Sequence, residues 1–371
     1  MQLVAYGAQD IYLTGNPQIT FFKVVYRRHT NFSMEAIEQT WNGNAAGANG
    51  TCTATISRNG DLVHRMYLEF TGDTTAGKVN PGSTAISDIE LEIGGQKIDK
   101  HTGPWMETWA ELTESNPTGH TGQSDGSNKT GTLFQLMSGM GGAHSGAAST
   151  KHFVPLQFWF CRNPGLALPL IALQYHEVKV ILNHSVGDKY AGEPTNQLWC
   201  DYIYLDTDER RRFAQVSHEY LIEQVQEQTW RNTSKQLNFN HPVKELIWKR
   251  TDSASDNAVT NTWKLKLNGH DRFASRDFRY FTRTQVWQHH SGAGGLKPAT
   301  GQGDEGQFND SIAVYSFALK PEEHQPSGTC NFSRIDNAQL DSGASGDYNV
   351  YAVNYNVLRI MSGMGGLAYS N

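Results

Sequence analysis

The sequence predicts an all-β protein built from two tandem jelly rolls, each an eight-stranded antiparallel sandwich, with a few short helices in the loops. Three observations lead to this class. Apolar and polar residues alternate with a period of two along much of the chain, which is typical of half-buried strands. Gly-rich and Asn-Gly turns separate these short runs, as in sandwiches and jelly rolls. The length of 371 residues exceeds a typical single domain and suits two.

The clearest strand in the first part of the chain covers residues 88–93. Ile89, Leu91 and Ile93 face one side of it, and the glutamates between them face the other. Gly94-Gly95 follows and offers a two-residue hairpin turn. This pattern predicts a half-buried strand with one core-facing row.

Three further strands follow from the same period. A strand over 62–70 carries an apolar row, and Asn59-Gly60 before it predicts a hairpin with residues 54–56. Inward-facing rows in the other two strands comprise Val178, Val180 and Leu182, then Trp263, Leu265 and Leu267 before an Asn-Gly turn. Near the end of the chain, residues 351–357 alternate in the same way.

Helical signals are few. Residues 104–114 begin with Pro104, and Trp105, Trp109 and Leu112 follow at helical spacing. Residues 206–213 place acids first and arginines last, which suits the helix dipole, and this charged segment is the expected junction of the two domains. Two tracts rich in Gly and polar residues, 116–149 and 288–309, are expected to be long loops.

Composition limits the possible partners. The net charge is −6 and only 18% of residues are charged, so direct binding of nucleic acid is not expected. Much of the surface must then be neutral or covered by other chains. The four cysteines are far apart without a CxxC pair, which indicates reduced thiols rather than a disulfide scaffold. The chain shows no signal-peptide core and no run of about 20 apolar residues, so we expect a soluble protein made in the cytosol.

No motif predicts chemistry. His176 and His184 would lie about 27 Å apart on a straight strand, and the neighbours His289 and His290 would point to opposite sides if extended, so neither pair is expected to bind one metal ion. Glu90 and Glu92 lie on a solvent-facing row and not in an apolar pocket that would raise a pKa for hydrolysis. Phosphate-loop and nucleophile-elbow motifs are missing too. We therefore predict no catalytic, cofactor or metal site and no enzyme activity.

Four segments carry a resemblance to a known family. In chain order they are NPQITFFKVVYRRHTNF at 16–32, LPLIALQYHEVKV at 168–180, YSFALKPEEHQPSGTCNFSRIDNAQL at 315–340 and NYNVLRIMSGMGGLAYSN at 354–371. Together they closely resemble segments of the major capsid proteins of nucleocytoplasmic large DNA viruses, such as chloroviruses, iridoviruses and mimiviruses. Because the segments lie at both ends and in the middle, the resemblance covers nearly the whole chain.

The resemblance implies a structural coat protein. Two jelly rolls per chain and three chains per ring would give a pseudo-hexagonal homotrimeric capsomer that tiles the icosahedral shell of a double-stranded DNA virus. The implied parts are an inner-face segment (1–24), a first jelly roll (25–205), a linker (206–215) and a second jelly roll (216–371). Implied partners are neighbouring capsomers, minor capsid and penton proteins, and an internal membrane near the inner face. The protein would be made and assembled in host cytoplasm and reside in the virion.

Two further expectations complete the sequence interpretation. Members of this family can carry sugars, and the Asn-x-Ser/Thr sites Asn128 and Asn309 lie in the two long tracts, so they are the candidate glycosylation sites. A soluble, lectin-like carbohydrate-binding β-sandwich protein is the alternative function, since it would share the strand pattern and the aromatic content. A monomer that binds glycans saturably would favour that alternative.

Overall fold

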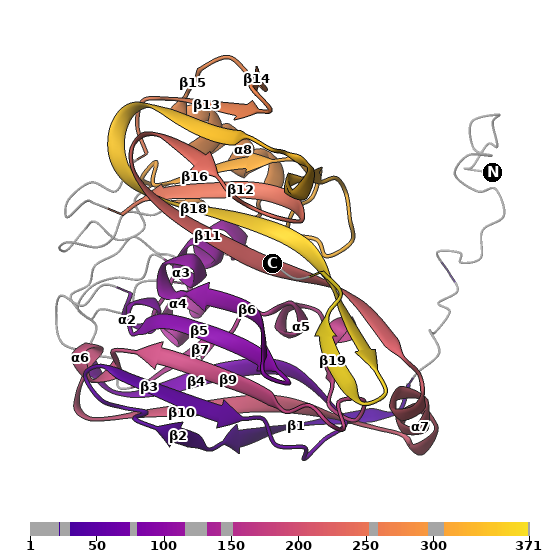
Figure 1. Cartoon of the computed structure of the whole chain (residues 1–371). Coiled ribbons are helices and arrows are strands. Elements are labelled where there is room, and N and C mark those ends of the chain that lie inside the picture. Colours follow the sequence, from indigo (N-terminus) through magenta and orange to yellow (C-terminus); the bar gives the residue numbers. More distant parts are fainter. Residues whose placement is uncertain are drawn as a thin grey trace, which may run out of the picture. The chain divides into compact units, whose positions relative to one another are not determined.

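The structure is a computed structural model that describes Phe22 and residues 30–74, 80–115, 132–141, 151–251, 259–295 and 308–369. The chain divides into a segment up to Phe32 and a compact unit from Ser33 onward. Strands dominate this second unit and helices are short (Figure 1). The all-β prediction is confirmed.

The first half of the compact unit, up to residue 205, contains two five-stranded antiparallel sheets. One sheet has the order β1-β10-β4-β7, with β8 beside β4; the other has the order β2-β3-β9-β5-β6. The bounds are β1 Phe32–Gln39, β10 Tyr190–Leu205, β4 Leu62–Thr74, β7 Lys151–Pro155 and β8 Leu168–Pro169, then β2 Trp41–Gly43, β3 Gly50–Thr55, β9 Val178–His184, β5 Ile86–Ile93 and β6 Gln96–Thr102.

The strands predicted for this half are confirmed, but one predicted hairpin is wrong. Strand β5 buries Ile89, Leu91 and Ile93, and the following Gly94-Gly95 pair turns into β6 with φ angles of 58° and 82°. Asn59-Gly60 does not make the predicted hairpin. Strand β3 pairs with β2 and β9, whereas β4 pairs with β10, β7 and β8 in the other sheet. The turn therefore carries the chain from one layer to the other.

The second half, from residue 218, forms one continuous nine-stranded sheet with the path β14-β13-β18-β12-β16. Its strands are β11 His218–Leu237, β12 Pro242–Arg250, β13 Thr262–Leu267, β14 His270–Asp271, β15 Arg276–Asp277, β16 Ile312–Ser316, β17 Cys330–Asn331, β18 Ala338–Met361 and β19 Met364–Leu367. The turn Asn268-Gly269 joins β13 to β14 as predicted, with positive φ at both residues.

Two long strands explain why this sheet is continuous. Strands β11 and β18 pair along their whole lengths, but their register slips between Asn232 and Ser234. On one side of the slip the order is β11-β18-β12-β16, and on the other it is β11-β18-β13-β14. These orders repeat β1-β10-β4-β7 and β3-β9-β5-β6 of the first half. The two halves therefore share one topology, with two strands of the second half bending through both layers.

The helices fill connections between strands. Two predicted helices are confirmed: α3 at Gly103–Thr113, where the Thr102 side chain accepts a hydrogen bond from the Trp105 amide, and α7 at Thr207–Gln215, between the halves and capped by Asp206. The others are α2 Pro81–Thr84, α4 Leu133–Ser138, α5 Trp159–Arg162, α6 Val186–Lys189 and α8 Gln285–His289, with the 3-10 turns η1 Pro164–Leu166 and η3 Phe332–Arg334 and the π-helical turn η2 Tyr280–Thr284. Within the described ranges, none of these helices is long and apolar enough to span a bilayer.

Two large apolar cores lie in the compact unit. The smaller one belongs to the second half and contains Leu246, Trp248 and Trp263. The larger one fills the first half and continues into the second through Ile247, Val314 and Tyr351. Because strand residues alternate between faces, β12 contributes Ile247 to one core and its neighbours to the other. The outer face of one sandwich is thus part of the interior of the chain.

Candidate functional site at the junction of the two halves

Helix α3 of the first half packs against the second half. Its Trp105 ring packs 5.1 Å from the ring of Tyr351 on β18, and Trp109 contacts His290 edge-on at 6.4 Å. The loop after α8 also caps the helix. The Gly292 amide donates to the Leu112 carbonyl at 2.7 Å, and the Ser291 hydroxyl donates to the Thr113 carbonyl at 2.9 Å. Carbonyls that a helix end leaves unpaired are satisfied here by the other half.

A buried ion network lies beside this helix. One carboxylate oxygen of Glu223 accepts from Arg162 at 2.5 Å, and the other accepts from Lys244 at 2.7 Å. His324 Nδ1 lies 3.4 Å from the same carboxylate. Burial alone would raise the pKa of Glu223, but the surrounding cations outweigh it and lower the pKa to about 2. Glu223 therefore stays ionised and links α5 of the first half to β11 and β12 of the second.

A second network of three charged residues is centred on the buried His290. Its Nε2 lies 2.9 Å from Glu245, and its Nδ1 lies 3.0 Å from Glu322. Burial would lower the pKa of His290, yet the two carboxylates prevail and raise it to about 9. Glu322 also accepts from the amide and the hydroxyl of Ser291, each at 2.8 Å. An imidazolium thus fixes the loop that caps α3.

Polar contacts continue along the junction to the C-terminal hairpin. The Thr102 hydroxyl donates to Glu227 at 3.0 Å, and the Val225 amide donates to Asp99 at 3.2 Å. Beyond them, the Leu367 amide donates to Gln96 at 3.1 Å. These bonds tie β6, an edge strand of the first half, to β11 and to β19, which lie beside it in Figure 1.

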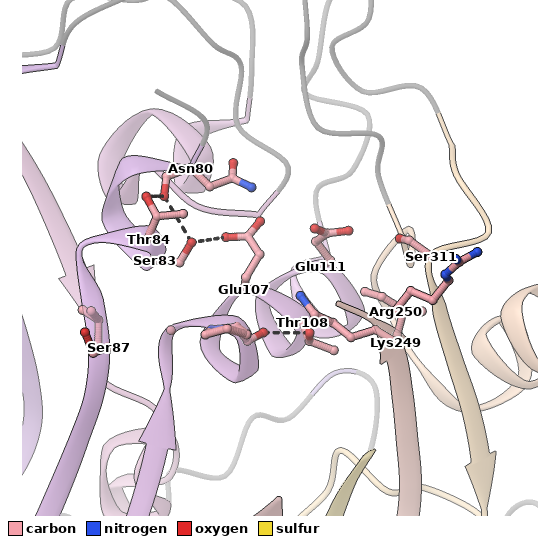
Figure 2. Close-up of a pocket in the computed structure, with 14 residues that line it drawn as sticks. Asn80, Ser83, Thr84, Ser87, Glu107, Thr108, Glu111, Lys249, Arg250 and Ser311 are labelled. Carbon is pink, nitrogen blue, oxygen red and sulfur yellow. Dashed lines mark hydrogen bonds between the residues drawn. The ribbon is translucent and has the colours of Figure 1, made fainter. Parts of the chain in front are cut away.

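A cavity of about 550 Å³ opens where the halves meet near α3 (Figure 2). First-half residues including Asn80, Ser83 and Glu107 line it, and so do Lys249 and Arg250 of the second half. Glu107 accepts from the Ser83 hydroxyl at 2.8 Å and from the Gly141 amide at 2.9 Å, so its carboxylate ties α3 to two other segments. Both of its oxygens take part in structural hydrogen bonds, which accords with a packing role.

The histidines considered from the sequence have structural partners. His176 contacts the Gly365 carbonyl at 2.9 Å, and His184 contacts the Asn44 carbonyl at 2.7 Å. His289 contacts the Leu319 carbonyl at 3.2 Å, while His290 belongs to the buried network. Across the part of the chain that the structure describes, no three His, Cys, Asp or Glu side chains gather in a way that could hold a metal ion. All four cysteines are free.

The structure describes one of the two candidate glycosylation sites, Asn309. Asn128 lies outside the described residues. Asn309 is half-buried and sits in a tight turn, where its amide donates to the Gly295 carbonyl and its carbonyl accepts from the Ser311 amide. The adjacent Asp310 is held by Arg283 through two hydrogen bonds. The turn at Asn309 is therefore well anchored.

Sequence reasoning missed both ion networks. Glu223, Lys244 and Glu245 occupy strands as ordinary polar residues, and a polar residue on an alternating strand predicts a solvent-facing side chain. No local signal marks these positions, because the second half buries them against the first. The arrangement is suited to locking two sandwiches together, since Arg162 of the first half pairs with Glu223 and the Trp109 ring contacts His290. The Arg162 Nε and one Glu245 oxygen are buried without a hydrogen-bond partner.

Comparison with known proteins agrees with this structural role. A family model described as "Major capsid protein N-terminus" matches residues 20–206, and one described as "Large eukaryotic DNA virus major capsid protein" matches residues 209–366. The chain is 53% identical over 409 residues to the major capsid protein of Pyramimonas orientalis virus, and 41% identical over 458 residues to that of Paramecium bursaria Chlorella virus 1. Each alignment covers 100% of this chain and 99% of the relative.

Solved structures give the same result. The structure described as "PBCV-1 virus capsid, quasi-atomic model" matches with a TM-score of 0.79 and 36% identity, covering 95% of this chain and 100% of that one. The Faustovirus major capsid protein matches with a TM-score of 0.64 over 96% of this chain and 94% of its own; at 14% identity this is a likeness of fold. These findings confirm the resemblance that the four sequence segments indicate.

Proposed function

We propose, from the premise that this chain belongs to the major capsid proteins of large eukaryotic DNA viruses, that three copies of it form a pseudo-hexagonal capsomer that tiles an icosahedral shell. Membership in the family makes the protein structural and not an enzyme.

The repeated strand order is the observation that carries this proposal. The first half has the strand orders β1-β10-β4-β7 and β3-β9-β5-β6, and the second half has the equivalent orders β11-β18-β12-β16 and β11-β18-β13-β14. One chain therefore supplies two similar wedges. Three chains then supply six wedges, and a ring with threefold symmetry approaches sixfold symmetry. Contacts within such a ring are heterologous and close after three copies. The buried ion networks keep the two wedges of one chain at a fixed angle, which a regular tile requires.

We assign the parts as residues 25–205 for the first jelly roll, 206–215 for the linker and 216–371 for the second, with 1–24 facing the inside of the shell. Partners proposed on this basis are neighbouring capsomers, minor capsid and penton proteins and, near the inner face, an internal membrane. The net charge of −6 supports a shell that encloses DNA without binding it directly. Assembly would take place in host cytoplasm, and the tract 116–149 would project outward or contact neighbours. In the tract 288–309, Ser291 and Gly292 instead cap α3 within the chain.

Sedimentation velocity of the purified protein tests the trimer. We expect one species with three times the 41.3 kDa mass of the chain, stable at micromolar concentration because such interfaces are of obligate size. A monodisperse monomer at that concentration would contradict the proposal. The same monomer binding saturably on a glycan array would favour the lectin-like alternative.

Asn128 and Asn309 are the proposed glycan acceptors. Each begins an Asn-x-Ser/Thr tripeptide, and each lies in one of the two long tracts. Peptide mapping of protein from virions would detect hexose mass on the peptides containing these residues. Unmodified peptides at both positions would remove the proposal without affecting the capsid assignment.

A further inference from the structure

The outer face of one sheet in the second half is covered from within the chain. Tyr351, Ile247 and Val314 form a cross-strand row on β18, β12 and β16, and all three are fully buried. Helix α3 covers this row, with the Trp105 ring 5.1 Å from Tyr351. An aromatic side chain from one sandwich thus packs on the sheet face of the next sandwich.

The corresponding row of the first half is not buried in this way. On β10, β4 and β7 the equivalent cross-strand row is Trp199, Tyr67 and Pro155, with Phe153 beside it. Trp199 and Tyr67 are half-buried, and Phe153 is 36% exposed. The rings of Tyr67 and Trp199 stack at 6.4 Å, and Tyr67 meets Phe153 edge-on at 6.2 Å. We call these three aromatic residues the aromatic face.

An open cavity adjoins the aromatic face. Its volume is about 660 Å³, and Tyr67 and Phe153 line it together with Trp109, Phe134 and Met137. Near the face, Lys151 forms an ion pair with Glu69 on the neighbouring strand. The cavity wall also includes charged residues: Arg65, Glu114, Arg162, Asp201 and Glu322. The partly exposed rings of the aromatic face are therefore the surface that an apolar side chain of a partner can cover.

The second half carries a helix in the same place in the strand order as α3. Helix α3 lies between β6 and β7, and the η2–α8 segment lies between β15 and β16. Val286 on α8 is buried in its own chain, whereas the next residue, Trp287, is 82% exposed. Leu319 is 76% exposed and adjoins this helix, because its carbonyl contacts His289 at 3.2 Å. The segment from Gln285 to Gln288 carries no charged side chain.

We propose that Trp287, with Leu319 beside it, docks on the aromatic face of a second copy of this chain. Within one chain, α3 packs on the outer sheet face of the second half. Between chains, α8 would pack on the outer sheet face of the first half of a neighbour, as expected when six similar wedges occupy a ring. Each copy offers one tryptophan and receives another, so the contact is heterologous and closes after three copies. Buried aromatic anchors in a hollow supply much of the energy of such interfaces. This inference rests on the proposed trimer and names its surfaces.

Trp287→Arg tests the proposal, with Tyr175→Arg as the matched control because Tyr175 is 75% exposed and lies beside Gly363 of the C-terminal hairpin. Sedimentation equilibrium would follow trimer dissociation, and circular dichroism with thermal melting would follow the fold. We expect Trp287→Arg to raise the concentration for half-dissociation by at least about tenfold, as loss of an anchor does. The Tyr175→Arg trimer should dissociate at the same concentration as the wild type.

A second variant tests the pairing itself. Trp199→Glu alone should weaken the trimer, and a chain that carries both Trp287→Arg and Trp199→Glu should recover at least part of the loss, because the new charges face each other across each contact. A wild-type trimer that tolerates Trp287→Arg with unchanged dissociation would overturn this inference and leave the proposed function standing. A wild-type monomer would overturn both.

Discussion

The Glu223 carboxylate lies 2.7 Å from the Lys244 ammonium, and the two side chains are only 3% and 1% exposed. Arg162 from the first half binds the other oxygen of the same carboxylate. Moving such charges out of water is costly, so the group stabilises the junction only while it is complete. One carboxylate thereby controls whether two cations at the contact of the sandwiches are neutralised.

Glu223→Gln should strongly destabilise the chain. The change removes the ion-pair partner of the buried Lys244, and breaking a buried pair in this way typically costs about 3–5 kcal/mol of unfolding free energy. Urea denaturation followed by fluorescence would measure it. Glu219→Gln is the matched control on the same strand, since its ion pair with Arg359 is exposed on both sides and should contribute less than about 1 kcal/mol. Equal losses for the two variants would show that the buried network does not lock the junction.

Stability should fall in mild alkali because of His290. Its pKa is about 9 in the folded protein against about 6.5 when unfolded. A raised pKa gives stability that is fully present below pH 6.5 and is lost as the pH rises through 9. The shift corresponds to about 3 kcal/mol. Thermal melting of wild type and His290→Gln from pH 6 to 10 would measure it.

The decisive quantity for His290 is the difference in melting temperature between wild type and His290→Gln. It should be largest at pH 6 and smallest above pH 9, since only the wild type carries the imidazolium. His270→Gln is the control, because His270 is exposed on the short strand β14. A gap between wild type and His290→Gln that stays constant over the whole range would contradict the pairing with Glu245 and Glu322.

Gly292→Ala should loosen the cap of α3. A Cβ at Gly292 would lie 2.4 Å from the Glu111 carbonyl oxygen and 2.5 Å from the Leu112 carbonyl carbon, and both are backbone atoms. Overpacking of this kind costs about 1–3 kcal/mol. Gly165→Ala is the control, since its nearest contact would be the Asn163 side chain at 3.3 Å. Hydrogen exchange should be faster at the C-terminal end of α3 in Gly292→Ala alone; unchanged exchange there would refute the capping role.

The strands and helices that depend on local pattern could be predicted from the sequence. Alternation gave the buried rows of β5, β9 and β13, and the position of Pro104 and the order of charges gave α3 and α7. The hairpin at Asn59-Gly60 failed because a turn motif does not say which strands it joins. Strand β3 pairs with β9 and strand β4 pairs with β10, each more than a hundred residues away, and these pairings place β3 and β4 in different sheets.

The junction could not be predicted, and β18 shows the reason. Sequence alternation over 351–357 indicates one buried face, but nearly every residue from Tyr348 to Leu358 is buried. Asn354 and Tyr351 are both inside, because one face packs in the second half and the other faces the rest of the chain. Burial on a second face comes from contact between halves, which no local period encodes. The proposed assembly follows from the family resemblance, because the pattern alone does not indicate how chains associate.

Electron microscopy of the purified, untagged protein tests the central claim most directly. Two similar sandwiches per chain in a threefold ring should give class averages with six lobes and threefold symmetry, of nearly hexagonal outline. Averages with only two lobes, or particles without rotational symmetry, would contradict the account.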